Sequence, residues 1–158
     1  MMDRRKFMRL AVEEARKGCS KGEGGPFGAC IVRKGAVVGL GRNNVLKAGN
    51  PTLHAEVCAI NAACERLHTH ELDDCEIYST TEPCVMCFAA VNWAKIKVIY
   101  FGTAVPDVKK LGFNELTISN RTLKRLGKSA VRIYPGFCRE ECVELFEFWK
   151  GLPTKRTY

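Results

Sequence analysis

Two short motifs, far apart in the sequence, restrict more than any other feature what this chain can fold into. Residues 54–56 read His-Ala-Glu, and residues 83–87 read Pro-Cys-Val-Met-Cys. Histidine and cysteine are common ligands of zinc, and a catalytic zinc site takes three protein ligands and leaves its fourth tetrahedral position to water. His54, Cys84 and Cys87 supply three such ligands, so the fold is expected to bring both motifs to one point.

Glu56 follows His54 by two positions, so its carboxylate is expected beside the metal without binding it. A carboxylate in that place can take a proton from the metal's water and pass it to the substrate. A structural zinc site is the alternative, with Cys58, Cys64 or Cys75 as the fourth ligand, because structural sites close all four positions with protein groups. A structural site has no use for the neighbouring carboxylate, so the pattern favours a catalytic zinc ion.

An H-x-E motif followed by P-C-x-x-C is the signature of zinc-dependent deaminases that act on nucleobases. On these motifs the chain resembles the cytidine deaminase superfamily, and within it the bacterial guanine deaminases. The second resemblance uses three further stretches, at residues 24–29, 50–52 and 82–83. It implies a Zn2+ cofactor at the N-termini of two helices, a three-layer α/β/α sandwich with a five-stranded mixed sheet, and a homodimer.

Hydrophobic spacing along the chain agrees with that architecture. Helical spacing predicts helices over residues 3–18, 53–67 and 139–150, one from Pro83 or Cys84 to about Trp93, and a short one over 121–126. Apolar or alternating runs predict strands over residues 27–33, 36–41, 73–80, 96–101 and 130–134. Residues 43–51 are predicted to form a loop, and 104–128 to be irregular apart from the short helix. Strands that alternate with helices on this scale indicate α/β layers.

The length and composition are those of a globular protein. A chain of 158 residues, 46% of them hydrophobic, is expected to form a single domain over residues 1–158 with its own core. The charged N-terminal residues do not resemble a signal peptide, and no apolar run is long enough to span a bilayer. The nine cysteines are therefore expected to be reduced, apart from the two on the metal, in a cytoplasmic protein.

The formal net charge of +8 allows two interpretations, attraction to nucleic acid or an ordinary basic surface. The positive residues are spread along the chain, and only residues 121–128 form a cluster. That cluster contains no aromatic residue that would stack on a base. The pattern therefore favours a basic surface, with tRNA binding as the alternative.

Six positions are expected to contact the substrate, four of them in the first two thirds of the chain. Phe27 is either a stacking wall for the base or a core residue that opens a strand, and Asn43 either reads the polar edge of the base or forms a turn. Ala55 is implied to offer its backbone N–H to a substrate carbonyl. Trp93 packs near the site, at a subunit contact, or in the core, and its pattern alone favours the core.

The other two positions are Glu115, where the chain departs from the resemblance, and Tyr158, where it keeps the family's residue. Guanine deaminases carry an Asp-Asp pair after Gly-Phe, whereas this chain has Asn114 and Glu115 after Phe113, which keeps the second carboxylate on a longer arm. Tyr158 matches a tyrosine that closes the site in that family, in some cases from a swapped partner. Residues 131–142 look more like the C-terminal region of tRNA adenosine deaminases or fungal-type cytosine deaminases.

Together these features predict a hydrolytic deaminase that releases ammonia from an amino-substituted nucleobase, with guanine to xanthine as the first hypothesis. Zinc lowers the pKa of the water it binds toward about 7, so hydroxide would attack the ring carbon while Glu56 carries the proton. The alternatives are adenosine-to-inosine editing of tRNA and deamination of cytosine or another nucleoside. A zinc-stabilised binding module without turnover is the non-enzymatic alternative.

Overall fold

A five-stranded mixed sheet forms the centre of the molecule in the computed structural model, which describes residues 3–158. In spatial order the strands are β2 (Ala36–Arg42), β1 (Gly28–Arg33), β3 (Cys75–Thr81), β4 (Val98–Thr103) and β5 (Arg132–Pro135). β1 pairs antiparallel with β2 and β3, whereas β3 with β4 and β4 with β5 are parallel pairs. The mixed sheet that the resemblance implied is confirmed.

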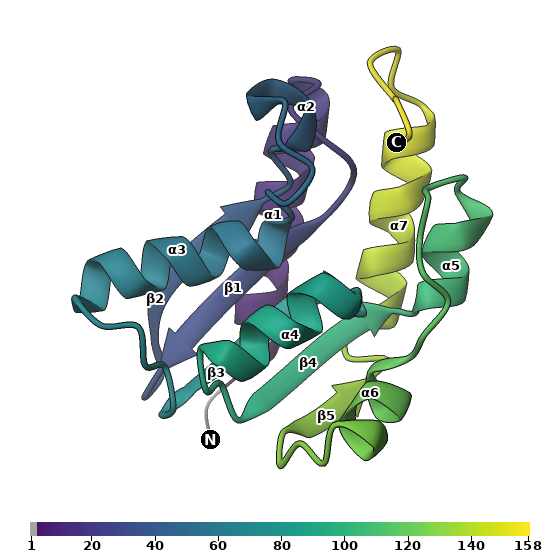
Figure 1. Cartoon of the computed structure of the whole chain (residues 1–158). Coiled ribbons are helices and arrows are strands. Elements are labelled where there is room, and N and C mark those ends of the chain that lie inside the picture. The colour runs from purple at the N-terminus through teal and green to yellow at the C-terminus, as the bar shows by residue number, and fades with distance from the viewer. Residues whose placement is uncertain (1–2) are drawn as a thin grey trace.

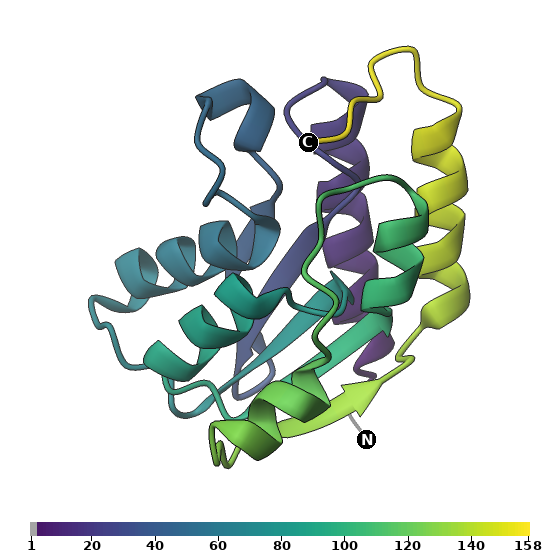
Figure 2. The same ribbon diagram turned by 45° about the vertical axis from the view of Figure 1, so that its right-hand side comes forward.

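Helices cover both faces of this sheet (Figure 1). One face carries α3 (Ala55–Leu67), α4 (Val85–Trp93) and α6 (Asn120–Leu126), and the other carries α1 (Arg5–Ser20) and α7 (Arg139–Lys150), as Figure 2 shows. The three-layer α/β/α arrangement is therefore also confirmed. No bound predicted for these helices and strands is wrong by more than two residues.

Alternate side chains of the central strands enter two separate cores, as the pleat of a strand requires. Ile31 and Ile77 belong to the buried cluster that includes the inner sides of α3 and α4. Val32 and Tyr78, one residue further along each strand, belong to the cluster that includes α1 and α7. A sheet buried on both faces holds its strand ends firmly, and Phe27, Asn43 and Glu82, which belong to the site described below, lie next to those ends.

The start of α3 lies directly on β2 because two residues of that strand are glycines. A Cβ atom on Gly41 would clash with the backbone oxygen of Ala55, and one on Gly39 would clash with that of Ala59. This close approach fixes the first turn of α3, and that turn carries the first sequence motif.

Two short helices occur where the sequence predicted a loop or irregular chain, namely α2 (Val45–Ala48) and α5 (Val105–Lys110). At the start of α5, the Asp107 carboxylate accepts a hydrogen bond from the backbone N–H of Ala104 (2.8 Å). Pro106 occupies the first turn, where a helix does not need an N–H group. Neither helix is long enough to show a hydrophobic period of its own, so periodicity missed both.

The chain after α7 folds back over the molecule. Thr154 donates a hydrogen bond to the backbone oxygen of Cys19 (3.2 Å), and the C-terminus ends beside the loop that follows α1 (Figure 2). Residues from the two ends of the sequence therefore meet at one edge of the fold. Of the helices within residues 3–158, none combines the length and apolarity needed to cross a bilayer.

Candidate active site

The two sequence motifs meet at the N-termini of neighbouring helices. His54 is the residue before α3, and Cys84 is the residue before α4, and both have extended backbones. The two helices lie side by side on the same face of the sheet (Figure 1). This is the placement that the resemblance implied for the metal.

His54, Cys84 and Cys87 form a group that fits a zinc ion. Their ligand atoms all lie within 4.8 Å of one another, and Nδ1 of His54 is 3.5 Å from Sγ of Cys84. Two ligands of a tetrahedral zinc ion lie at about this separation, given bonds of about 2.0–2.3 Å. Within residues 3–158, no other histidine, cysteine or acidic side chain joins the group. The donor set therefore leaves the fourth position open, as catalytic zinc requires.

The surroundings of Cys84 favour the thiolate form of its sulfur. A hydrogen bond from the Cys87 side chain, followed by the interaction with His54, lowers the pKa of the Cys84 thiol to about 4. The backbone N–H of Cys87 also donates to Sγ of Cys84 (3.5 Å). The thiolate is the form that binds zinc, so the first turn of α4 already favours the ligand state.

Glu56 lies in the first turn of α3 and is only 4% exposed. One of its carboxylate oxygens accepts a hydrogen bond from the hydroxyl of Ser79 on β3 (3.0 Å). Burial, and then the negative charge of Cys84, raises the pKa of the Glu56 carboxyl group above its ordinary value. Because a general acid–base works best when its pKa is close to the working pH, the buried Glu56 is suited to accept a proton and return it.

A cavity opens beside this group. Its walls contain four of the six expected substrate contacts together with Glu56 and two of the metal ligands. The lining residues are Phe27, Asn43, His54, Glu56, Thr81, Glu82, Cys84, Val108, Phe113, Asn114, Glu115 and Tyr158.

Aromatic rings form one side of the cavity. The centroids of the Phe27 and Phe113 rings are 5.1 Å apart in an edge-to-face arrangement, and those of Phe113 and Tyr158 are 5.2 Å apart. Phe27 is also part of the main buried cluster. The two interpretations of Phe27 are therefore compatible, since one part of the ring packs in the core while another bounds the cavity.

Asn43 and Tyr158 bring the end of β2 and the end of the chain to the cavity. Asn43 is 1% exposed, and its Oδ1 accepts a hydrogen bond from the Val45 N–H (3.2 Å), so the predicted turn role is present. The Tyr158 hydroxyl accepts from the backbone N–H of Gly25 (3.4 Å), and its backbone oxygen accepts from the N–H of Asn114 (3.0 Å). The tail thus closes this side of the cavity from within the same chain.

Glu115 stands in the cavity at the position of the altered acidic pair. Burial, and then the negative charge of Cys84, raises the pKa of its carboxyl group to about 7. Near neutral pH this group exists in both protonation states. It can therefore either accept a hydrogen bond from a base or donate one.

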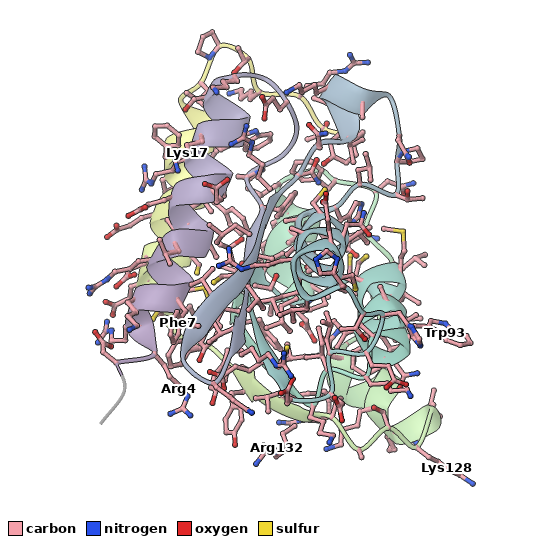
Figure 3. All side chains as sticks on the ribbon, turned by 90° about the vertical axis from the view of Figure 1, so that its left-hand side faces the viewer. Arg4, Phe7, Lys17, Trp93, Lys128 and Arg132 are labelled. Atoms are coloured by element: carbon pink, nitrogen blue, oxygen red, sulfur yellow. The ribbon has the colours of Figure 1, made fainter. Side chains whose placement is uncertain are left out.

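Trp93 does not take the predicted place near the site. Its side chain is 82% exposed and points away from the molecule (Figure 3), and the predicted core position is wrong as well. The reason is geometric: α4 begins at the metal group, so its last residue lies at the far end of the helix. Ala55 is fully buried as the first residue of α3, where the helix itself does not use its backbone N–H.

Five lining residues were not singled out from the sequence. They are Thr81, Glu82, Val108, Phe113 and Asn114. Glu82 directly precedes the second motif, and Asn114 directly precedes Glu115, so adjacency was the signal that could have found these two. Val108 lies on α5, which the sequence did not predict, so no pattern connected it to the site.

Comparisons with known proteins agree with this geometry. Residues 1–103 match the model of the cytidine and deoxycytidylate deaminase zinc-binding region. The chain is 36% identical to guanine deaminase of Bacillus subtilis over 157 residues, which covers 99% of this chain and all of that protein. It is also 39% identical to the tRNA-specific adenosine deaminase of Agrobacterium fabrum over 145 residues, or 92% of each chain.

The fold comparison agrees as well. The structure of guanine deaminase from Nitrosomonas europaea superimposes with a TM-score of 0.84 at 27% identity, covering 95% of this chain and 86% of that one. The matched zinc-binding region includes both motifs, His54 with Glu56 and Cys84 with Cys87. The chain belongs to the cytidine and deoxycytidylate deaminase family of zinc-dependent hydrolases.

Proposed function

We propose that this enzyme converts guanine and water to xanthine and ammonia. The main support for the proposal is that Asn43, Glu115 and Tyr158 line the same cavity as Glu56 and His54. Polar groups that converge on an aromatic-walled cavity are what the recognition of a flat, polar-edged base requires. The full-length similarity to a guanine deaminase supports the same substrate.

The residues of the chain divide the reaction between them. His54, Cys84 and Cys87 hold the zinc ion, which when bound acts as a Lewis acid that makes water nucleophilic near pH 7. Glu56 takes the proton of the attacking water and delivers it to the ring nitrogen beside the carbon that bears the amino group. The hydroxyl of Ser79, 3.0 Å from Glu56, keeps the carboxylate aimed during both transfers. Glu56 then takes the remaining proton of the added hydroxyl group and gives it to the amino nitrogen. The carbonyl of xanthine forms as the bond from that carbon to the amino nitrogen breaks, and ammonia leaves.

The remaining cavity residues orient the base. Phe27 and Phe113 confine the ring, while Asn43 offers an amide to its polar edge. The free backbone N–H of Ala55 is available to a substrate carbonyl. The Glu115 carboxylate accepts hydrogen bonds from the N–H groups of the base. Such fixed positioning accounts for a large share of the rate in enzymes of this kind.

The direct test is ammonia release from zinc-loaded protein supplied with guanine, with free cytosine and adenosine as parallel substrates. We expect ammonia from guanine in an amount equal to the xanthine formed. Release from cytosine alone, or from adenosine alone, would replace guanine as the assigned substrate while leaving the reaction class intact.

Replacement of Glu115 is expected to change guanine turnover and to leave zinc binding unchanged. In Glu115→Gln the group can no longer change its protonation state, so kcat/KM for guanine is expected to fall about a hundredfold. Glu115→Asp, which restores the family residue, is expected to retain most of the activity. Steady-state kinetics on both variants, with zinc content measured in parallel, provide the check. Equal kinetics in wild type and Glu115→Gln would remove Glu115 from the substrate contacts.

A second candidate function is adenosine deamination in tRNA, and one surface feature favours it. A cavity of about 770 Å³ lies along α6, separate from the active-site cavity except for the shared wall at Glu82. Four basic side chains line it: Arg121, Lys124 and Arg125 on one face of α6, and Lys128 in the turn that follows. Within residues 3–158, none of the four has an acidic partner in an ion pair. Unpaired cations along a groove suit an RNA backbone.

A charge reversal on α6 separates the two functions. The variant Lys124→Glu/Arg125→Glu is compared with Lys34→Glu/Arg66→Glu, which changes the net charge equally at exposed positions outside the groove. We expect guanine turnover to be unaffected in both. Inosine formation in tRNA that is lost only in the α6 variant, together with salt-dependent binding, would establish the second function instead.

We also propose that the enzyme is cytoplasmic and forms a homodimer. The three most exposed large apolar residues are Trp93 on α4 (82%), Leu126 on α6 (66%) and Leu116 in the segment between α5 and α6 (63%). Contact with a second copy would cover such side chains, and Trp93 retains its alternative role as a subunit contact.

A further inference from the structure

Glu82 is a buried carboxylate that the proposed chemistry leaves without a role. It is 7% exposed, lines the active-site cavity and stands two residues before the metal ligand Cys84. We infer that Glu82 is a positioning residue: it holds the segment from Val105 to Asn120 against the cavity and so determines how the substrate base is contacted. Only the identity of that base rests on the proposed function.

Both carboxylate oxygens of Glu82 are occupied by backbone groups. One accepts a hydrogen bond from the N–H of Val105 (3.1 Å), and the other from the N–H of Asn120 (2.7 Å). The backbone N–H of Glu82 itself donates to the oxygen of Thr103 at the end of β4 (2.7 Å). Within residues 3–158 the carboxylate takes part in no ion pair. Both of its oxygens therefore accept charge-assisted hydrogen bonds from backbone N–H groups in a buried setting.

Asn120 returns a contact to the motif that carries the metal ligands. Its side-chain nitrogen donates to the backbone oxygen of Pro83 (2.5 Å), and the residue is completely buried. Its side-chain oxygen is the buried polar atom that lacks a partner in the described part of the chain. The two segments are therefore joined twice: the Glu82 side chain accepts from the backbone of Asn120, and the Asn120 side chain donates to the backbone of Pro83, the residue after Glu82.

The segment between the two anchored N–H groups carries one wall of the site. Val108, Phe113, Asn114 and Glu115 all belong to it, and all line the cavity. Asn114 also binds the backbone oxygen of Tyr158, so the C-terminal tail depends on the same segment. Because one carboxylate holds both ends, loss of either hydrogen bond would displace the whole wall relative to Glu56. A displacement of about 1 Å can reduce catalysis by about a hundredfold.

Glu82→Gln tests this inference directly. Glutamine keeps one acceptor oxygen but turns an N–H2 group toward the second backbone N–H, so one anchor is lost. We expect the Kd for 8-azaguanine and the KM for guanine to rise about tenfold to a hundredfold. The kcat should fall much less, and the zinc content should stay at the wild-type value. Hydrogen exchange at the amides of Val105 and Asn120 should become faster.

Glu76→Gln is the matched control. Glu76 is also a carboxylate that accepts a hydrogen bond, from the Tyr78 hydroxyl (2.6 Å), and it pairs with Arg4, but it lies on β3, outside the segment from Val105 to Asn120 and outside the cavity. Its replacement is expected to lower the melting temperature while leaving the Kd for 8-azaguanine unchanged. A rise in Kd of the same size in both variants would reduce Glu82 to a structural residue and overturn the inference.

Two further outcomes are informative. If Glu82→Gln does not fold, Glu82→Asp keeps the charge on a shorter arm, and the same split between KM and kcat is expected in a milder form. An unchanged Kd together with unchanged amide exchange in either variant overturns the inference. If the wild-type enzyme releases no ammonia from guanine, the proposed function fails, and the exchange rates of Val105 and Asn120 still decide whether Glu82 holds the segment.

Discussion

Glu56→Gln is expected to lower kcat by about a thousandfold while leaving zinc content unchanged. The side chain is buried in the first turn of α3, beside the metal group but outside it. Glutamine has the same shape and can still accept the hydrogen bond from Ser79, so the fold should be preserved. It cannot take up a proton, however. It can therefore neither accept the proton of the attacking water nor deliver that proton to the base.

The measurement is ammonia release under saturating substrate, with metal analysis of the same sample. Glu65→Gln is the matched control, since Glu65 is an exposed glutamate on the same helix. Turnover at the wild-type rate in a fully metallated Glu56→Gln protein would show that another group carries the proton, and Glu115 would be the next candidate because of its raised pKa of about 7.

Cys84→Ala is expected to abolish both zinc binding and activity. It removes one of the three ligands and the thiolate whose pKa is lowered to about 4. Zinc that binds only the folded protein contributes about 4 kcal/mol of stability at a free concentration a thousand times its Kd. Loss of the ion should therefore also lower the melting temperature, by roughly 10 °C.

The readouts are zinc per chain by metal analysis, ammonia release and thermal unfolding with and without a chelator. Chelation of the wild-type protein should reproduce the low melting temperature of the variant, and added zinc should restore only the wild type. Cys58→Ala is the matched control: Cys58 is a half-buried thiol one turn after His54 that does not join the metal group. Full zinc occupancy in Cys84→Ala would contradict the assigned ligand set.

The chemistry of the site could be inferred from the sequence because it depends on local patterns. His54 and Cys84 each stand at the start of a helix, and Glu56 and Cys87 lie within one turn of them. Residues within one helical turn of each other point to the same side of the helix, so their spacing predicts that they act together. Long apolar runs of the strands predict a sheet buried on both faces. The zinc ligands, the class of fold and the bounds of the main elements were therefore accessible without coordinates.

The walls of the cavity were decided by the tertiary structure. Trp93 stands on a helix whose pattern allowed burial, yet it is 82% exposed at the end of α4. Phe27 and Asn43 each kept two interpretations, and only packing showed that Phe27 belongs both to the core and to the cavity wall, and that Asn43 both forms a turn and lines the cavity. The short helix α5 is held by Asp107 and Glu82 rather than by any period of its own.

Glu82 shows the physical reason for this division. Its two hydrogen-bond partners are the backbone N–H groups of Val105 and Asn120. Every residue except proline has such a group, so no residue type in the sequence predicts these contacts. The sequence by itself determined which side chains can bind zinc and move a proton, because those functions need particular residue types at short spacing. Only the tertiary structure decided which segments enclose the substrate, because enclosure depends on contacts between residues that are distant in the chain.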